Sequence, residues 1–329
     1  MSLPYASAGR AAHHLTRAAV LAPSPHNSQP WFFAEEGRDQ GFEIHLDRGR
    51  RLILTDPAGR EAVIACGAAL FNVRIAVRHL GFRPAVTLLP DSRDSGFLAQ
   101  VGYAAHAPAT ADEARLARAI PLRHTHRGPF GTEPLPDTLL AELRDHARAE
   151  GADLQIIDEP EGLDHLAELV RAAENVHRAD HGHTAELARC IGPYGLPVDA
   201  CRHHPDRTFL PSRDYLGLAR RITLPSRRKW RATGTVVVLT TLHDDRTDWL
   251  RSGQALQRLL LHAATRQVMA AFHTQPLELP ELRTELRTHL AAHRFPQAIL
   301  RLGHTTEVWN VPRRAPAEVL VRGSVPVGR

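Results

Sequence analysis

The sequence predicts a mixed α and β protein built from two halves that share one pattern. Stretches with apolar residues at helical spacing alternate with short strand-like runs along the 329 residues. One long apolar helix in each half is followed by a strand, and the two helices share a short motif, Gly67-x-Ala69-Leu70 and Gly253-x-Ala255-Leu256. Glycine and alanine let two helices approach closely, so we expect a helix pair at the centre of a pseudo-symmetric molecule.

The first half, residues 1–108, is expected to form two strands between two helices, and two further strands after them. Its helices are expected at 9–22 and 56–80, and its strands at 32–34, 42–46, 83–90 and 97–104, with a short additional strand at 51–55. The second helix is placed at Asp56-Pro57 because aspartate suits the cap and proline the first helical position. Its middle, Ala62 to Val73, is apolar nearly all round, which is typical of a helix buried on most sides.

The second half, residues 109–329, is expected to be richer in helix. Its helices are expected at 112–119, 137–150, 162–189, 248–272 and 280–293, its strands at 154–157, 235–241 and 297–302, and the tail 305–329 is expected to be mostly extended. Between them, residues 191–233 are rich in Pro, Gly and Arg, and a stretch of that length is usually a lid or a disordered connection.

Composition bounds the class of protein. The chain is 43% hydrophobic, which suffices for a packed core, and its longest near-apolar run is well below the ~20 residues that cross a bilayer. The N-terminus lacks the continuous apolar segment of a signal peptide. The three cysteines, Cys66, Cys190 and Cys201, form no close pair. We therefore expect a cytoplasmic protein without a membrane span or structural disulfides.

The positive charge is concentrated in one segment. Residues 202–231 hold nine Arg or Lys residues against two Asp residues, an excess of +7, whereas the net charge of the whole chain is +5. Such a segment attracts phosphate, either of nucleic acid or of a phosphorylated cofactor. The segment has aromatic residues but no glycine-rich or helix-turn-helix signature, so a basic nucleic-acid-binding module is kept only as an alternative.

A loop at residues 23–31, Pro-Ser-Pro-His-Asn-Ser-Gln-Pro-Trp, lies between a predicted helix and a predicted strand. Its three prolines fix φ and remove backbone donors, so the polar side chains between them are held in place. A loop of this kind can bind a polar ligand, and a plain surface turn is the alternative. Its order, Ser-x-x-Asn-x-Gln-Pro-Trp, resembles the loop by which one half of a nitroreductase-family dimer touches the flavin mononucleotide (FMN) held by the other half. The resemblance implies that Pro23, Ser24 and Asn27 contact the cofactor.

Residues 123–127, Arg-His-Thr-His-Arg, are similar to the Arg-x-Ser/Thr-x-Arg/Lys segment with which nitroreductase subunits begin. By that resemblance Arg123 and Thr125 bind the flavin, and Arg127 lies near the N1/O2 edge of its ring. A permanent positive charge there stabilises the negative charge that the ring gains on reduction. A solvated basic turn is the alternative.

Two later segments complete the resemblance. Residues 275–279 are similar to the family segment whose backbone amides approach flavin N5 and O4, which implies contacts from Pro276, Leu277, Glu278 and Leu279, with Glu278 acting through its main chain. Residues 312–320 are similar to the basic C-terminal piece that holds the flavin phosphate. Arg313 or Arg314 would form a charge-assisted pair with it.

The four segments occur in family order, and the chain resembles the fused, single-chain Acg-like branch of the nitroreductase family. That resemblance implies an α+β nitroreductase-like fold with a central mixed or antiparallel sheet surrounded by helices. It also implies one FMN per chain and a lid, here residues 191–233, over the flavin. Pro25 departs from the serine of ordinary nitroreductase loops, which removes one contact to the ribityl chain.

The resemblance implies an FMN-dependent oxidoreductase that passes electrons from NAD(P)H to a small electron-poor acceptor, with no catalytic side chain because the flavin carries the redox chemistry. A non-catalytic FMN-binding or storage protein is the first alternative. Two fused chains are expected to pair as a homodimer, without membrane or nucleic acid. Histidine pairs such as His124-x-His126 and His181-x-His183 lack ligands at structural-site spacing, so no metal is expected.

Overall fold

The computed structural model describes residues 10–37, 40–193, 195–221 and 234–322. Contacts divide the chain into two units: unit 1 comprises Met1–Leu122, Asp245–Leu261 and Arg313–Arg329, and unit 2 comprises Arg123–Asp244 and His262–Pro312. The units interleave along the sequence, so they differ from the contiguous halves that meet at residue 108. The division into two repeated halves, residues 1–108 and 109–329, remains a prediction.

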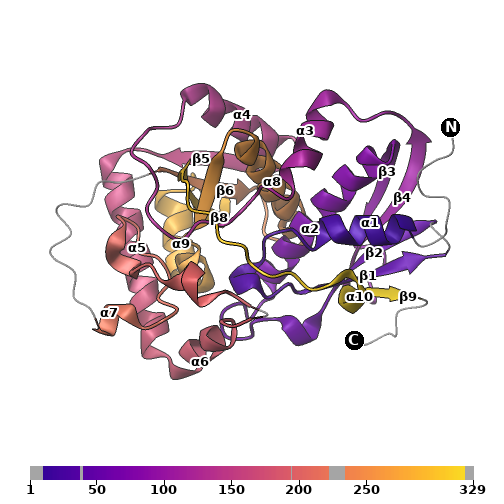
Figure 1. The fold of residues 1–329 in the computed structure, drawn as a ribbon. Coiled ribbons are helices and arrows are strands. Elements are labelled where there is room, and N and C mark those ends of the chain that lie inside the picture. The colour runs from indigo at the N-terminus through magenta and orange to yellow at the C-terminus, as the bar shows by residue number, and fades with distance from the viewer. Residues whose placement is uncertain (1–9, 38–39, 194, 222–233, 323–329) are drawn as a thin grey trace. The chain divides into compact units, whose positions relative to one another are not determined.

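Unit 1 is built on a five-stranded sheet in the order β3-β4-β2-β1-β9 (Figure 1). Its strands are β1 (Trp31–Glu36), β2 (Gly41–Leu46), β3 (Phe82–Leu88), β4 (Phe97–His106) and β9 (Leu320–Arg322). Neighbouring strands are antiparallel except β1 and β9, which pair in parallel with Phe33 opposite Leu320. The sheet is therefore mixed, and its last strand comes from the far end of the sequence.

The helices of unit 1 enclose the core. They are α1 (Arg10–Ala19), α2 (Arg60–His79), α3 (Ala111–Ala119), α10 (Pro316–Val319) and most of α8 (Arg246–Thr265), with the 3-10 turns η1 (Pro25–Asn27) and η2 (Arg48–Arg50). By length and composition α2 could cross a membrane, but 89% of its most apolar stretch is buried inside the structure, as in the core helix of many soluble proteins. It packs with Phe33, Phe42 and Ile44 of the sheet.

The two glycine motifs meet where α2 and α8 cross. A Cβ atom added to Gly67 would lie 2.3 Å from the carbonyl oxygen of Leu250, and one added to Gly253 would lie 2.0 Å from that of Ile64. Only glycine fits at both positions, which confirms the predicted close approach of the two helices. Asn72 of α2 adds a buried hydrogen bond, because its Oδ1 accepts from Nε2 of Gln257 at 2.7 Å. The pseudo-symmetry of the whole chain stays a prediction.

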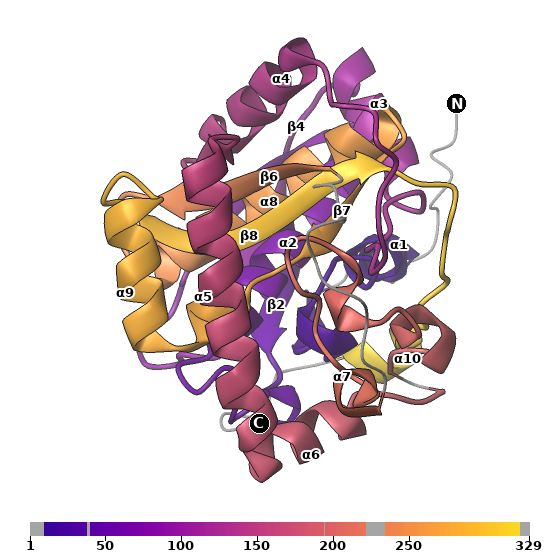
Figure 2. The same cartoon turned by 90° about the vertical axis from the view of Figure 1, so that its left-hand side faces the viewer.

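Unit 2 is built on a four-stranded antiparallel sheet in the order β5-β6-β8-β7. Its strands are β5 (Asp153–Ile157), β6 (Thr235–Thr241), β7 (Val268–Phe272) and β8 (Phe295–His304). Helices α5 (Pro160–Ala179) and α9 (Pro280–His289) lie beside β6 and β8 in Figure 2. Leu166 of α5 and Leu286 of α9 share a core with Val238 of β6 and Ile299 of β8.

The remaining elements of unit 2 are short or lie at its margin: α4 (Asp137–Arg148), α6 (His181–Arg189), α7 (Leu218–Arg221), η3 (Val198–Cys201), η4 (Pro205–Arg207) and η6 (Gln275–Glu278). The described residues thus form two sheets, one in each unit, where the sequence suggested a single central sheet. The α+β class is confirmed.

Two expectations about the first half were wrong in detail. Residues 51–55 form a turn and no strand. Helix α2 begins at Arg60, four residues later than predicted, because Asp56 and Gly59 form a turn in which Gly59 has a φ of +73°. Asp56 still stabilises the helix start, since its Oδ2 accepts from the backbone N–H of Ala62 at 2.9 Å.

Two long predicted helices in the second half are interrupted. The helix expected at 162–189 breaks at Asp180, whose Oδ1 accepts from the N–H groups of Gly182 at 2.7 Å and His183 at 3.2 Å and so caps α6. The helix expected to reach residue 272 ends at Thr265, and Val268–Phe272 pairs with β8 as strand β7. The helix expected at 280–293 ends at His289, and the tail contains α10 as well as β9.

Candidate functional site

The loop at residues 23–31 is rigid and partly strained. His26, Asn27 and Gln29 have positive φ values of +48°, +60° and +49°, which only asparagine and histidine among them adopt with any ease. The loop is held by an internal hydrogen bond, in which Ser24 Oγ accepts from the N–H of Gln29 at 3.0 Å. Pro23 and Asn27 are buried and Ser24 is half-buried. Backbone strain of this kind persists where the surroundings fix it, often at ligand sites.

The basic C-terminal segment binds this loop within unit 1. Arg313 Nη1 donates to Asn27 Oδ1 at 2.6 Å, and the backbone N–H of Arg314 donates to Gln29 Oε1 at 2.8 Å. The Arg314 guanidinium also donates to the carbonyl oxygen of Trp31 at 3.1 Å and lies 3.4 Å from Asp47 Oδ2. The structure thus brings the first and fourth predicted segments together.

The second predicted segment lies beside β7 in unit 2. Thr125 bridges to Ala270, and the N–H of His126 donates to the Ala270 carbonyl oxygen at 2.9 Å. Arg123 is buried and Thr125 is half-buried. Arg127 is half-buried, and its Nη1 atom is buried without a hydrogen-bond partner among the residues that the structure describes. A buried donor of this kind requires an acceptor, which an ordered water or a ligand can supply.

The third segment follows the same strand. After β7 ends, the chain forms η6, in which Pro276 and Leu277 are buried, and Glu278 and Leu279 are half-buried. The second and third predicted segments therefore lie along β7 and directly after it. The side chain of Glu278, for which the resemblance implied no role, is only 1% exposed and pairs with Arg213 inside the protein.

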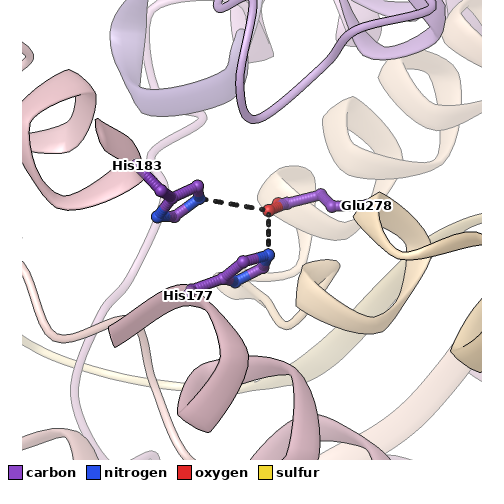
Figure 3. A group of neighbouring side chains, drawn as sticks. All are labelled: His177, His183 and Glu278. Atoms are coloured by element: carbon purple, nitrogen blue, oxygen red, sulfur yellow. Dashed lines mark ion pairs between the residues drawn. The ribbon is translucent and has the colours of Figure 1, made fainter. Parts of the chain in front are cut away.

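Glu278 belongs to a buried cluster that was not predicted from the sequence (Figure 3). Its Oε2 lies 3.4 Å from His177 Nε2 and 3.8 Å from His183 Nε2, while its Oε1 accepts from Nη2 of Arg213. Arg213 Nη1 lies 3.2 Å from His177 Nδ1 and 3.5 Å from His183 Nε2. Burial, and next the charge of Arg213, lower the pKa of His177 to about 4, so this histidine is neutral at pH 7. Only the break at Asp180 allows His183 to lie beside His177, and the sequence gives no spacing signal for that.

Two histidines and a glutamate could suggest a metal centre, but the geometry favours a different cation. The two imidazole rings stack 4.1 Å apart at 7°, so an ion about 2.0 Å from a nitrogen of each would lie far out of both ring planes. In addition, a neutral His177 that accepts from Arg213 at Nδ1 carries its proton on Nε2, the atom that faces Glu278. The guanidinium of Arg213 is therefore the cation of this cluster.

Comparison with known proteins identifies the family. No protein-family model matches the chain. A Mycobacterium tuberculosis H37Rv protein named "Putative NAD(P)H nitroreductase Rv3131" is 32% identical over 289 residues, which cover 87% of this chain and 82% of the relative. The protein named "Putative NAD(P)H nitroreductase acg" from the same strain is 30% identical over 307 residues, or 91% of this chain and 90% of the relative. The chain therefore belongs to the nitroreductase family, as predicted.

Solved structures give a more distant likeness. FMN and NADPH-dependent nitroreductase NfnB from Sphigopyxis sp. strain HMH has 17% sequence identity and a TM-score of 0.42 over 64% of this chain and 99% of its own. A nitroreductase with bound FMN from Desulfitobacterium hafniense DCB-2 has 13% identity and a TM-score of 0.39 over 60% of this chain and 94% of its own. The family assignment rests on the sequence relatives.

Proposed function

We propose that the protein is an FMN-dependent NAD(P)H oxidoreductase that passes electrons to a small electron-poor acceptor. The single observation that carries the proposal is the buried Nη1 of Arg127, which has no hydrogen-bond partner among the described residues. A buried donor left unpaired costs about 1–3 kcal/mol, so this position is expected to be filled by an acceptor of a ligand. FMN is the ligand to test first, because the chain belongs to the nitroreductase family and nitroreductase structures similar to it are described with bound FMN.

The residues present fit FMN, which offers ring carbonyls, a polar ribityl chain and a dianionic phosphate. In unit 2, Arg123, Thr125 and Arg127 supply two cationic groups and a hydroxyl beside β7, and Pro276, Leu277, Glu278 and Leu279 supply a buried turn after it. In this proposal Arg127 holds positive charge near the ring edge that becomes negative on reduction, which favours the reduced state. When bound, FMN supplies the hydride-accepting chemistry, so the side chains are needed for binding and charge.

In unit 1, we assign a flavin contact to the loop residues Pro23, Ser24 and Asn27, and a phosphate contact to Arg313. Arg314 already donates to Trp31 and the carbonyl oxygen of Glu318 and is paired with Asp47, so its charge is committed inside the unit. The guanidinium of Arg313 is held by Asn27, a neutral amide. Because Arg313 contacts the loop that we assign to the flavin, we assign the charge-assisted bond to phosphate to Arg313.

The predicted lid, residues 191–233, lies partly outside the described residues, because residue 194 and residues 222–233 are not described. Within the described part, Leu210 is fully buried in the unit 2 core. A deletion of residues 202–228, made to test the predicted lid, would therefore remove core contacts as well as any cover over the flavin. The cytoplasmic location, the pairing of two chains and the absence of a nucleic-acid partner are also parts of this proposal.

The test begins with the absorbance spectrum of the purified protein and with extraction of its flavin. We expect one FMN per chain, bleached under anaerobic conditions by NADH or NADPH and reoxidised by a nitroaromatic acceptor. Bound FMN that neither nucleotide reduces would instead support the flavin-storage alternative. A protein that binds no FMN when reconstituted, but binds nucleic acid, would support the alternative of a basic nucleic-acid-binding module.

A further inference from the structure

A short stretch, Leu210–Arg213, contacts the connection from β7 to η6 at several points. The carbonyl oxygen of Pro211 accepts from Nδ1 of His273 at 3.0 Å and from Nε2 of Gln275 at 3.4 Å. Arg213 then binds the carboxylate of Glu278. Leu210 packs in the same core cluster as Leu277. This one stretch thus binds His273, Gln275 and Glu278, and shares a core cluster with Leu277.

Arg213 is the charged part of that contact. Its side chain is 7% exposed, and its Nε lies 3.9 Å from Glu174 Oε1, a second carboxylate. His177 and His183 present ring nitrogens to the same guanidinium, and their stacked planes keep it in one position. The two terminal nitrogens of the planar guanidinium thus face three different side chains, a role that a lysine ammonium fills less well. If Arg213 were absent, the buried carboxylate of Glu278 would lose the guanidinium that pairs with it.

The backbone of η6 is the feature that this contact positions. Pro276 has no N–H, and the N–H of Leu277 donates to the carbonyl oxygen of Thr274 at 2.8 Å. The 3-10 turn runs through Glu278, so the carboxylate that Arg213 holds belongs to the last residue of the turn. The conformation of η6 at this end therefore depends in part on the contact between Arg213 and Glu278.

We propose that Arg213 is a positioning residue that sets the reduction potential of the flavin through the η6 turn. This inference rests on the proposed function, because it requires FMN beside η6. Arg213 acts in two ways: it fixes the carboxylate of Glu278 and it neutralises its charge. Without neutralisation, the negative charge at the turn opposes the negative charge that the flavin ring gains on reduction, so the reduced cofactor binds less tightly relative to the oxidised one.

The experiment compares the affinities of oxidised and reduced FMN in the wild type, Arg213→Gln, Arg213→Lys and Glu278→Gln. In Arg213→Gln we expect the ratio of the reduced to the oxidised dissociation constant to rise at least tenfold, which is a fall of about 30 mV for a two-electron couple. Arg213→Lys should recover part of the change. Glu278→Gln, which leaves Arg213 without its carboxylate, should shift the potential upward.

Arg283→Gln is the matched control. Arg283 also binds a carboxylate with two donors in unit 2, at 2.7 and 2.8 Å from Asp244, so its loss tests general destabilisation. We expect it to leave the potential unchanged. An unchanged potential in Arg213→Gln would overturn the inference, and if that variant does not fold, a potential that does not rise in Glu278→Gln would do the same.

Two further outcomes separate this inference from other readings. If the wild type binds no FMN at all, the proposed function fails and the potential is not measurable, which differs from a measured potential that does not move. Titration with Zn²⁺ alone tests the cluster itself. Stoichiometric zinc binding lost in His177→Gln would show that Arg213 is displaceable there, and would overturn its assignment as the fixed cation.

Discussion

Replacing Gly253 by alanine is expected to disrupt the crossing of α2 and α8 in unit 1. The new Cβ would lie 2.0 Å from the Ile64 carbonyl oxygen, 2.8 Å from the Gly67 Cα atom and 2.9 Å from the Ala68 nitrogen. All three are backbone atoms, so no flexible side chain can move aside. Since carbon atoms in contact prefer separations of about 3.5–4.0 Å, the two helices must separate by roughly 1 Å.

The size of the effect follows from two opposing contributions. Overpacking of a rigid core costs typically about 1–3 kcal/mol, and a clash with backbone belongs at or above the upper end of that range. Alanine recovers about 1 kcal/mol of helix propensity relative to glycine. We therefore expect Gly253→Ala to lower the free energy of unfolding by at least about 2 kcal/mol. In Gly67→Ala plus Gly253→Ala the cost should be less than additive, because one separation relieves both clashes.

Urea unfolding, followed by circular dichroism and by the fluorescence of Trp31 and Trp249, measures this change. Gly102→Ala in β4 is the matched control in unit 1, since a Cβ atom there meets its nearest neighbours at 3.9 Å. We expect that control to stay within about 0.5 kcal/mol of the wild type. Equal stability of Gly253→Ala and Gly102→Ala would refute the close helix crossing.

The remaining predictions concern the cofactor residues and acid stability. Arg127→Ala should weaken FMN binding by about 1.5–3 kcal/mol and lower the flavin potential; unchanged affinity and potential in flavin titrations would exclude its assigned role. Arg313→Ala should weaken FMN binding more than Arg314→Ala does, whereas Arg314→Ala should lower the melting temperature more, because it frees Asp47 and the Trp31 carbonyl; the reverse pattern would exchange their roles. Acid should destabilise unit 2, since burial lowers the pKa of His177 to about 4 and that of His273 to about 3. Below pH ~6.5 these histidines bind protons in the unfolded chain but stay neutral in the folded chain. The free energy of unfolding therefore falls as the pH drops from about 6.5 to 4, by up to about 3 kcal/mol for His177 alone. His177→Gln should flatten this dependence, and a melting temperature equally steep in that variant would contradict the assignment.

Much of the secondary structure could be predicted from local patterns. Phe42 to Leu46 alternate between apolar and polar residues, which is typical of a strand, and the capping box of α3, in which Thr110 and Glu113 bind each other's backbone, has a local sequence signature. Residues 268–272 are different, because a short apolar run is compatible with helix and strand alike. These residues form a strand because they pair with β8, and that pairing is not visible in the sequence of the run itself.

In the candidate site, too, some features follow from local sequence patterns and others only from contacts between distant residues. The four motif segments were found because each is a contiguous string of residues, and the contact of Arg313 with Asn27 joins two of them. Arg213 and Glu278 are 65 positions apart and belong to no shared periodicity, so only the folded chain reveals their pairing. The charge count of residues 202–231 indicated a basic segment with affinity for phosphate, whereas Arg213 within it pairs with buried carboxylates.

The discontinuity of unit 1 has a consequence for how the protein is made. Its core includes Leu250 of α8 and Val319 of α10, and its sheet ends on β9 at residues 320–322. During synthesis from the N-terminus, the strands and α2 of this unit emerge long before the segments that complete their packing. The ribosome must therefore translate about two hundred further residues while an apolar sheet face lacks its final cover, and contacts so distant in sequence slow folding. Unit 2, whose segments span residues 123–312, is finished first, although it begins second.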